Sequence, residues 1–276
     1  MKEKEKKQIK INGFEVMDKC LFWKEKKILI IGDLHLGYEE VLKESGWAVP
    51  KTQMKETLLG LERIFKKTGR CKRIILMGDV KHYFSGILGG EWRDFYALMN
   101  ILKKNLLKNG KITIIRGNHD AILEPMIYSS EKNRENFETE IKDWEFIEGV
   151  LFLHGNWKGM NKKRINKIEE ELKRENKKID LIVCGHFHPA FVLKDKSGVK
   201  MEKYKCFLYG KSKEIGKKLI IMPSFFPLIE GTDITLHDFK LEGWLDVSGF
   251  CVFALDDEGK VYDFGRVRGK NAQTRI

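Results

Sequence analysis

The distribution of apolar residues predicts a series of buried strands separated by amphipathic helices. Apolar runs, which are typical of strands covered on both faces, occur at residues 28–31 and within residues 73–79, 111–120 and 181–189, where the last two segments continue into polar loops. Apolar residues recur instead at helical spacing over about 51–67, from Trp92 to Leu102 and over about 161–178. The alternation of the two patterns predicts an α/β fold.

Both ends of the chain are richer in strand patterns. An Asn12-Gly13 turn signal between short alternating runs predicts a hairpin near the N-terminus, and the segment from Cys20 to Ile31 predicts a second one. Residues 190–265 consist mostly of short apolar runs that also predict strands. Because no repeat, low-complexity linker or composition break divides the chain, we expect one domain over residues 1–276, with a flexible tail from about residue 267.

Composition excludes several classes of protein. Hydrophobic residues make up 42% of the chain, which is enough to bury a sizeable core and argues against intrinsic disorder. The most apolar stretch, Leu219–Ile229, is too short to span a bilayer, and the basic N-terminus is not followed by the apolar segment of a secretory signal. The five cysteines are widely scattered, which fits a reducing compartment. We therefore expect a cytoplasmic protein without membrane contact.

The formal net charge of +12 raises the question of a polyanionic partner. The charge is spread over short mixed runs of Lys and Glu, and this pattern is more typical of a solvated surface than of a nucleic-acid site. If nucleic acid binds, the first candidates are the basic segments Lys158–Lys178 and Arg266–Arg275.

Polar clusters follow the apolar runs where the predicted strands end. They are Gly32-Asp33-Leu34-His35, Gly78-Asp79, Gly117-Asn118-His119-Asp120, His154-Gly155 and Gly185-His186-Phe187-His188. Five of the seven histidines belong to these clusters. Since ligand sites of open α/β sheets lie at the carboxyl ends of strands, we expect the clusters to converge on one rim. The neighbouring glycines let the backbone turn sharply and approach a ligand closely.

The residue types in these clusters indicate metal chemistry. Carboxylate, imidazole and amide oxygen donors without a thiolate suit Mn²⁺, Fe²⁺ or Zn²⁺. Two such ions can clamp a phosphate and activate water for in-line attack. A pair of dications requires a shared anionic ligand, and Asp79 is the best candidate for that position.

The motifs D-x-H, G-D, G-N-H-D, H-G and G-H-x-H occur in this order between residues 32 and 188. The series resembles the calcineurin-like metallophosphoesterase superfamily. The segment GDVKH at residues 78–82 and the early hairpins resemble an archaeal branch related to the nuclease subunit SbcD. The resemblance implies a four-layer α-β-β-α sandwich of two mixed β-sheets flanked by helices, and a metal-dependent phosphoric ester hydrolase with a binuclear metal centre.

Carried over position by position, the resemblance also assigns roles. One metal ion would be held by Asp33, His35, Asp79 and His188, and the other by Asp79, Asn118, His154 and His186. His119 would contact the phosphate and protonate the leaving oxygen, with Asp120 orienting it, and a metal-bound hydroxide would be the nucleophile. The expected cofactors are two divalent ions, Mn²⁺ foremost and Fe²⁺, Zn²⁺ or Ni²⁺ as alternatives.

Several interpretations stay open at this stage. His82 is a candidate for contact with substrate or a metal-bound water, and a structural hydrogen bond explains it equally well. Arg116 could reach a phosphate, but a surface position at the end of a strand is the favoured explanation. Trp47, Tyr83 and Phe84 could stack on a base, but packing is the favoured explanation. We expect a phosphodiester substrate, with nucleic acid as one option. The alternatives are a small cyclic nucleotide, a phosphomonoester and a non-catalytic scaffold. The sequence also leaves open the oligomeric state and whether residues 129–143 form a lid.

Overall fold

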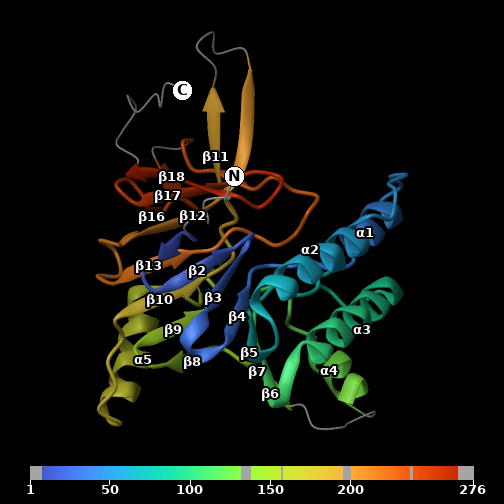
Figure 1. Cartoon of the computed structure of the whole chain (residues 1–276), viewed down its shortest axis with the longest axis horizontal. Helices are drawn as coiled ribbons and strands as arrows, with labels where there is room; N and C mark the ends of the chain where they lie inside the picture. The colour runs from blue at the N-terminus through green and yellow to red at the C-terminus, as the bar shows by residue number, and fades with distance from the viewer. Residues whose placement is uncertain (1–7, 132–137, 157, 195–199, 237–238, 267–276) are drawn as a thin grey trace, which may run out of the picture.

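Two mixed β-sheets packed face to face form the middle of the molecule (Figure 1). The computed structural model describes residues 8–131, 138–156, 158–194, 200–236 and 239–266. The seven strands of the first sheet follow one another in chain order: β1 (Lys10–Ile11), β2 (Phe14–Met17), β3 (Cys20–Trp23), β4 (Ile28–Ile31), β5 (Cys71–Leu76), β6 (Leu106–Ile115) and β7 (Glu138–Lys142). Strands β4 to β7 are parallel, whereas β1 to β4 form antiparallel hairpins.

The second sheet is assembled from the later part of the chain. Its main path runs β14 (Thr232–Asp233), β11 (Pro189–Lys194), β12 (Met201–Lys211), β13 (Lys218–Ile221), β10 (Leu181–Cys184), β9 (Val150–Leu153) and β8 (Trp144–Ile147), and β12 also pairs with β17 (Cys251–Leu255), which pairs with β18 (Val261–Arg266). Strands β9, β10 and β13 are parallel. A separate small hairpin joins β15 (Lys240–Leu241) to β16 (Leu245–Asp246).

Helices cover the outer faces of the two sheets (Figure 1). Helices α1 (Tyr38–Glu44), α2 (Gln53–Thr68), α3 (Gly89–Lys104) and α4 (Glu124–Glu131) lie on the side of the first sheet, α5 (Lys162–Lys173) lies on the side of the second, and the 3₁₀ turn η1 (Lys24–Lys26) links β3 to β4. None of the helices in the described ranges is long and apolar enough to cross a membrane. The arrangement is the four-layer sandwich of the predicted fold class, which is confirmed.

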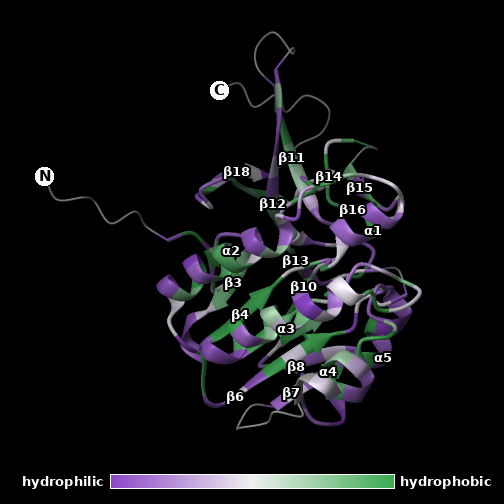
Figure 2. Ribbon diagram, turned by 90° about the vertical axis from the view of Figure 1, so that its right-hand side faces the viewer, coloured by the Kyte–Doolittle hydropathy of each residue, from purple (hydrophilic) through white to green (hydrophobic). Residues whose placement is uncertain are grey.

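Alternation along each strand divides the core into layers. Ile28 and Ile30 of β4 point into a cluster between the two sheets, where they join side chains of β5, β9, β10 and β13. Leu29 and Ile31 of the same strand point the other way, into the cluster beneath α2, α3 and α4. A third cluster lies between the second sheet and α5. Strand β4 is therefore apolar at every position, because both of its faces are buried. The central strands are accordingly green in Figure 2, whereas the helices are green on one side only.

The predicted elements are found close to their expected positions. The Asn12-Gly13 turn has positive φ angles of 48° and 92°, as a tight hairpin turn requires. Sequence patterns missed α1, α4 and β7. Helix α1 has no buried residue, and the residues of β7 are only partly buried, so neither shows a clear apolar period. Of the suggested lid at 129–143, residues 132–137 lie outside the described residues, and β7 is a strand of the first sheet. The predicted tail from residue 267 also lies outside them.

Candidate metal centre

The carboxyl ends of five strands bring the predicted ligands together. Asp33 and His35 follow β4, and Asp79 follows β5. Asn118 and His119 follow β6, His154 comes directly after β9, and His186 and His188 lie between β10 and β11. Within each sheet these strands are parallel neighbours, so their carboxyl ends share one edge. The predicted convergence of the clusters is thus observed for all seven proposed ligands.

Asp33, His35 and His188 form the first group of facing donors. The Nε2 atoms of His35 and His188 lie 3.4 Å apart, and His188 Nε2 lies 3.6 Å from Asp33 Oδ2. The backbone N–H of His186 donates to Asp33 Oδ1 at 3.0 Å, which fixes the carboxylate against the loop that carries His186 and His188. Burial lowers the pKa of His35 to about 3, so its ring is neutral and able to act as a ligand.

Asp79, His154 and His186 form the second group, with Asn118 beside it. The Nε2 atom of His154 lies 3.1 Å from His186 Nδ1, 3.0 Å from Asn118 Oδ1 and 3.3 Å from Asp79 Oδ2. This set matches the second predicted ligand set residue for residue.

Asp79 lies between the two groups. Its Oδ2 atom is 3.3 Å from Nε2 of His154 in the second group and 3.9 Å from Nε2 of His35 in the first. Burial raises the pKa of the Asp79 carboxyl, but the interactions with the surrounding histidines, His154 foremost, together outweigh burial and bring the pKa below its usual range. The carboxylate is therefore charged, and its position is that of a group shared by two cation sites.

The second group requires a positive charge. Nδ1 of His154 lies 2.9 Å from the carbonyl oxygen of Met77 and donates to it, so that Nε2 presents a lone pair to the oxygens of Asn118 and Asp79. Burial lowers the pKa of His154, but the charges of Asp79 and Asp33 raise it to about 9, so a proton binds strongly among these acceptors. A divalent cation bound by the same nitrogen and oxygen donors would supply the positive charge, and the donor set fits such an ion.

Four of the seven proposed ligands have a strained backbone. His35, Asp79, His186 and His188 all have positive φ, at 46°, 46°, 74° and 45°. Residues other than glycine rarely adopt this conformation, which costs about 1–3 kcal/mol each unless the surroundings enforce it. Here the backbone N–H of His35 donates to the carbonyl oxygen of Asp79 at 2.9 Å, which ties two of the strained positions together.

Two motif glycines allow the close approach predicted from the sequence. A Cβ atom on Gly117 would lie 2.2 Å from Oδ1 of Asp79, and one on Gly185 would lie 2.5 Å from Oδ2 of Asp33. Any side chain at either position would displace a ligand carboxylate.

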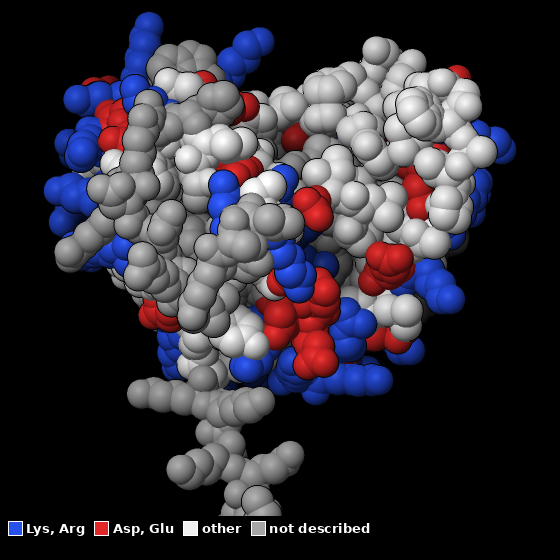
Figure 3. Space-filling model, turned by 90° about the horizontal axis from the view of Figure 1, so that it is seen from above, with Lys and Arg blue, Asp and Glu red and all other residues white. Residues whose placement is uncertain are grey.

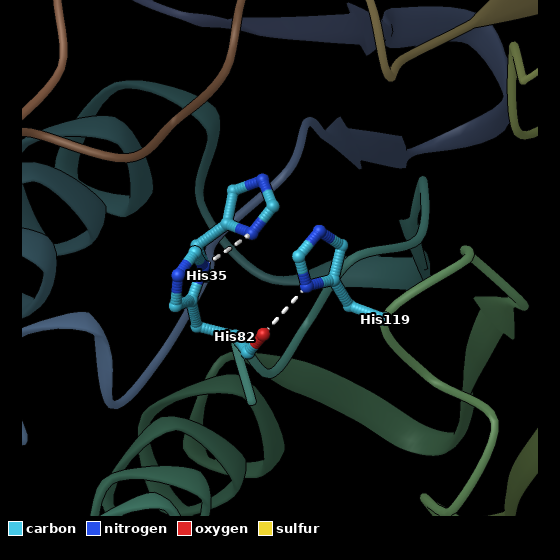
Figure 4. Close-up of side chains that lie close together, drawn as sticks. All are labelled: His35, His82 and His119. Atoms are coloured by element: carbon cyan, nitrogen blue, oxygen red, sulfur yellow. Dashed lines mark hydrogen bonds between the residues drawn. The ribbon is translucent and has the colours of Figure 1, made fainter. Parts of the chain in front are cut away.

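His82 lies beside the candidate metal ligand His35 and the proposed proton donor His119. Its Nδ1 atom lies 3.3 Å from His35 Nδ1, and its ring is stacked on that of His119, with centroids 5.2 Å apart and an angle of 24° between the planes. Figure 4 shows the three imidazoles facing one another from three different loops. They form a third group of metal-compatible donors, which sequence reasoning did not foresee as a group. Burial and the nearby His119 lower the pKa of His82 to about 4.

Asp120 does not contact the His119 ring as expected, and Arg116 lies in an ion pair near the surface, which was the favoured interpretation of it. The ring of His119 is held through Nδ1, which lies 2.5 Å from the carbonyl oxygen of His82. The Asp120 carboxylate instead accepts hydrogen bonds from the backbone N–H groups of Val80 at 3.0 Å and Gly117 at 3.1 Å, and it joins the two motif loops. Burial and the charge of Asp79 raise the pKa of Asp120 to about 7. Arg116 forms an ion pair with Glu124 and contacts the carbonyl oxygen of Asp120.

Two further residues support the site without belonging to a motif. Glu242, in the turn between β15 and β16, accepts a hydrogen bond at 2.6 Å from Nε2 of His186, which leaves Nδ1 of that ring free for the second group. Glu91 of α3 accepts hydrogen bonds from the backbone of His82 and Tyr83. The sequence marked Glu91 only as an acidic residue just before the helix predicted from Trp92, and nothing in the local pattern pointed to Glu242.

The family model for calcineurin-like phosphoesterases matches residues 26–190. The chain belongs to this family. The phosphoesterase is thus a hydrolase of a family that uses divalent metals, and the matched segment contains all seven proposed metal ligands. No curated protein matches the sequence significantly.

One of three similar solved structures supports the fold of this phosphoesterase. A nuclease of Pseudomonas putida is similar, with a TM-score of 0.58 and 19% sequence identity over 94% of this chain and 99% of the nuclease. An archaeal phosphodiesterase has a TM-score of 0.37 and 13% identity, with 86% of this chain and 98% of the other covered. A metallophosphoesterase of Sphaerobacter thermophilus has a TM-score of 0.33 and 15% identity, with 90% of both chains covered.

Proposed function

We propose that this phosphoesterase hydrolyses a phosphodiester with two divalent cations. The cations would be held by Asp33, His35, Asp79 and His188 and by Asp79, Asn118, His154 and His186. The observation that carries the proposal is the position of Asp79 Oδ2, at 3.3 Å from one group and 3.9 Å from the other. Bound cations would neutralise charge on the phosphate oxygens and supply a water of lowered pKa for in-line attack. The donors favour Mn²⁺, with Fe²⁺, Zn²⁺ and Ni²⁺ as alternatives.

His119 is the proposed proton donor to the leaving oxygen. Its Nδ1 atom is bound to the carbonyl oxygen of His82, which leaves Nε2 directed toward the metal groups, 3.9 Å from Asp79 Oδ2. When the ring is protonated, the N–H at Nε2 can donate to a phosphate oxygen or to the leaving group. The Asp120 carboxylate acts indirectly on the position of His119, because it fixes the loop of His119 to the loop of Asp79.

Nucleic acid is the proposed class of diester. The net charge of +12 favours a polyanion, and the similarity to a nuclease is compatible with one. On the face shown in Figure 3, however, Lys and Arg side chains are interspersed with Asp and Glu, so this face is not a continuous basic surface. A small cyclic nucleotide therefore remains the second candidate, since it would need few basic contacts.

Metal reconstitution tests the activity. Metal-stripped protein is loaded with Mn²⁺ and assayed on single-stranded DNA, duplex DNA, RNA, a 2′,3′-cyclic nucleotide and bis(p-nitrophenyl) phosphate. Restored hydrolysis of any of the diesters supports the proposal. A preparation that binds Mn²⁺ but hydrolyses none of them would contradict the proposal and leave a phosphomonoesterase or a non-catalytic scaffold as the explanation.

His119→Ala tests the role of the proton donor. Loss of a general acid lowers turnover by about 10²–10⁴-fold. We expect the loss on a diester with an alkyl leaving group and a much smaller one on bis(p-nitrophenyl) phosphate, whose leaving group needs no proton. Metal content, measured by mass spectrometry, should stay at the wild-type level. Equal losses on both substrates, or an emptied metal site, would contradict the assignment.

A further inference from the structure

A column of three neighbouring rings, one pair of them stacked and the other tilted, leads from the metal groups to the protein surface. The innermost ring, His82, lies beside His35 and is stacked on His119. The ring of Phe84 lies against the other partner of this stack, with its centroid 3.6 Å from that of His119 and 34° between the planes. Phe84 ends the column, and 54% of its surface is exposed.

The loop that carries Phe84 is held at both ends. The buried carboxylate of Glu91 accepts hydrogen bonds from the backbone N–H groups of His82 at 3.0 Å, Tyr83 at 2.7 Å and Leu88 at 2.9 Å. The ammonium group of the buried Lys81 donates to the carbonyl oxygen of Tyr83. An aromatic ring that is exposed on a loop with so many fixed backbone groups is presented in a defined position. It therefore offers a binding surface at little entropic cost.

We propose that Phe84 is a stacking platform for a nucleobase of the substrate, on the nucleotide whose phosphate occupies the metal centre. The inference rests on the proposed function and deepens it to nucleotide substrates. The ring of His119 covers only part of Phe84, and a flat apolar ligand would continue the column where the phenyl ring is exposed. Nucleobases are such ligands, and they stack on Phe, Tyr and Trp with little dependence on base identity. The neighbouring His119 is the group that would reach the phosphate of the same nucleotide.

Two matched esters separate the base from the phosphate. Thymidine 5′-(p-nitrophenyl phosphate) and methyl p-nitrophenyl phosphate share a leaving group, and only the first carries a base. In Mn²⁺-loaded protein we expect Phe84→Ala to lower the ratio of the two kcat/KM values by about tenfold, in line with the loss of one stacking contact. Phe84→Trp should restore the ratio. Tyr262→Ala, which removes an exposed aromatic ring from β18, is the matched control and should leave the ratio at the wild-type value.

A binding measurement makes the test independent of turnover. Thymidine 5′-monophosphate should quench the tryptophan introduced by Phe84→Trp more strongly than it quenches the six native tryptophans of the wild type. Deoxyribose 5-phosphate, which has no base, should not. An unchanged ratio in Phe84→Ala or equal quenching by both phosphates would overturn the subsite. If the wild type hydrolyses neither ester, the proposed function is wrong. The fluorescence titration alone then shows whether Phe84 stacks on a nucleobase.

Discussion

The two parts of the chain contribute to the metal centre in different ways. Residues 26–190, which match the family model, supply every proposed ligand. Residues after 190 supply contacts that hold those ligands: Glu242 binds the ring of His186, and the backbone N–H of Phe226 donates to the carbonyl oxygen of Asp33 at 3.1 Å. The first part therefore determines which atoms could bind a cation, and the second restricts how those atoms are oriented.

The difference has a physical origin. Ligands must be carboxylate, imidazole or amide groups, and they must lie at strand ends, so both their type and their place are constrained. A supporting contact needs only a hydrogen-bonding group of the right reach, and many positions in a fold can supply one. Substitutions in the first part should consequently lower metal affinity and activity more than substitutions in the second part. The substitutions below test this expectation in order of decreasing effect.

Asp79→Asn should have the largest effect. The substitution keeps the size of the side chain and removes the charge that lies between both groups, so both cation sites should weaken together. We expect Mn²⁺ affinity to fall by more than the roughly 10–100-fold that is typical of losing a supporting contact, with activity lost in parallel. Metal content after dialysis, measured by mass spectrometry, provides the readout.

The control for Asp79→Asn is Asp257→Asn, which neutralises an exposed carboxylate far along the chain. It should retain wild-type metal content. If Asp79→Asn still held two ions per chain after dialysis, Asp79 would not be a shared ligand, and the contrast between the two parts of the chain would lose its strongest support.

The structure shows why some of the site could be predicted and some could not. Asp33, Asp79 and His154 were predictable because each follows, directly or after one glycine, an apolar run that is typical of a buried strand. Glu242 follows His186 by 56 residues and lies in a hairpin of two-residue strands, so no local pattern marks it. Asp120 belongs to a motif, but its partners are backbone groups of a distant loop, and only the three-dimensional structure shows them.

The same reasoning applies to the fold. Strands β4, β5 and β10 are apolar at most or all positions, so their sequence signal is strong. Strand β7 is held by its parallel pairing with β6, although its side chains are mostly polar. Pairing with a neighbour stabilises such an edge strand, and a single-sequence pattern contains no information on that neighbour.

Glu242→Ala should have an intermediate effect that is confined to one group. Without the carboxylate at Nε2, the ring of His186 loses the partner that fixes its orientation and its tautomer. Calorimetric titration with Mn²⁺ should show one affinity lowered by about 10–100-fold and the other unchanged. Glu242→Gln retains an oxygen acceptor and should recover part of the loss.

Glu230→Ala, which removes an exposed carboxylate from the same later part of the chain, is the control for Glu242. Two unchanged Mn²⁺ affinities in Glu242→Ala would show that the hydrogen bond to His186 does not contribute to metal binding. Two lowered affinities would instead indicate that the substitution disturbs the whole site, and the later part of the chain would then act on both groups.

Lys205→Met should have the smallest effect, on stability alone. The ammonium group of Lys205 is enclosed by the carbonyl oxygens of Ser224 and Phe226, although the residue as a whole is only partly buried, and burial lowers its pKa to about 7. The unfolded chain binds this proton more tightly, so the wild type should gain stability as the pH rises from about 7 toward 10.5, by up to about 2 kcal/mol between pH 7 and 9. Urea unfolding at both pH values should show a smaller gain in unfolding free energy in Lys205→Met. Lys218→Met, which removes an exposed lysine of β13, is the control.

Equal gains in unfolding free energy in the wild type and Lys205→Met would mean that the ammonium group is solvated in the folded state. Lys205 would then not hold the segment that binds Asp33, and the later part of the chain would support the site through fewer contacts.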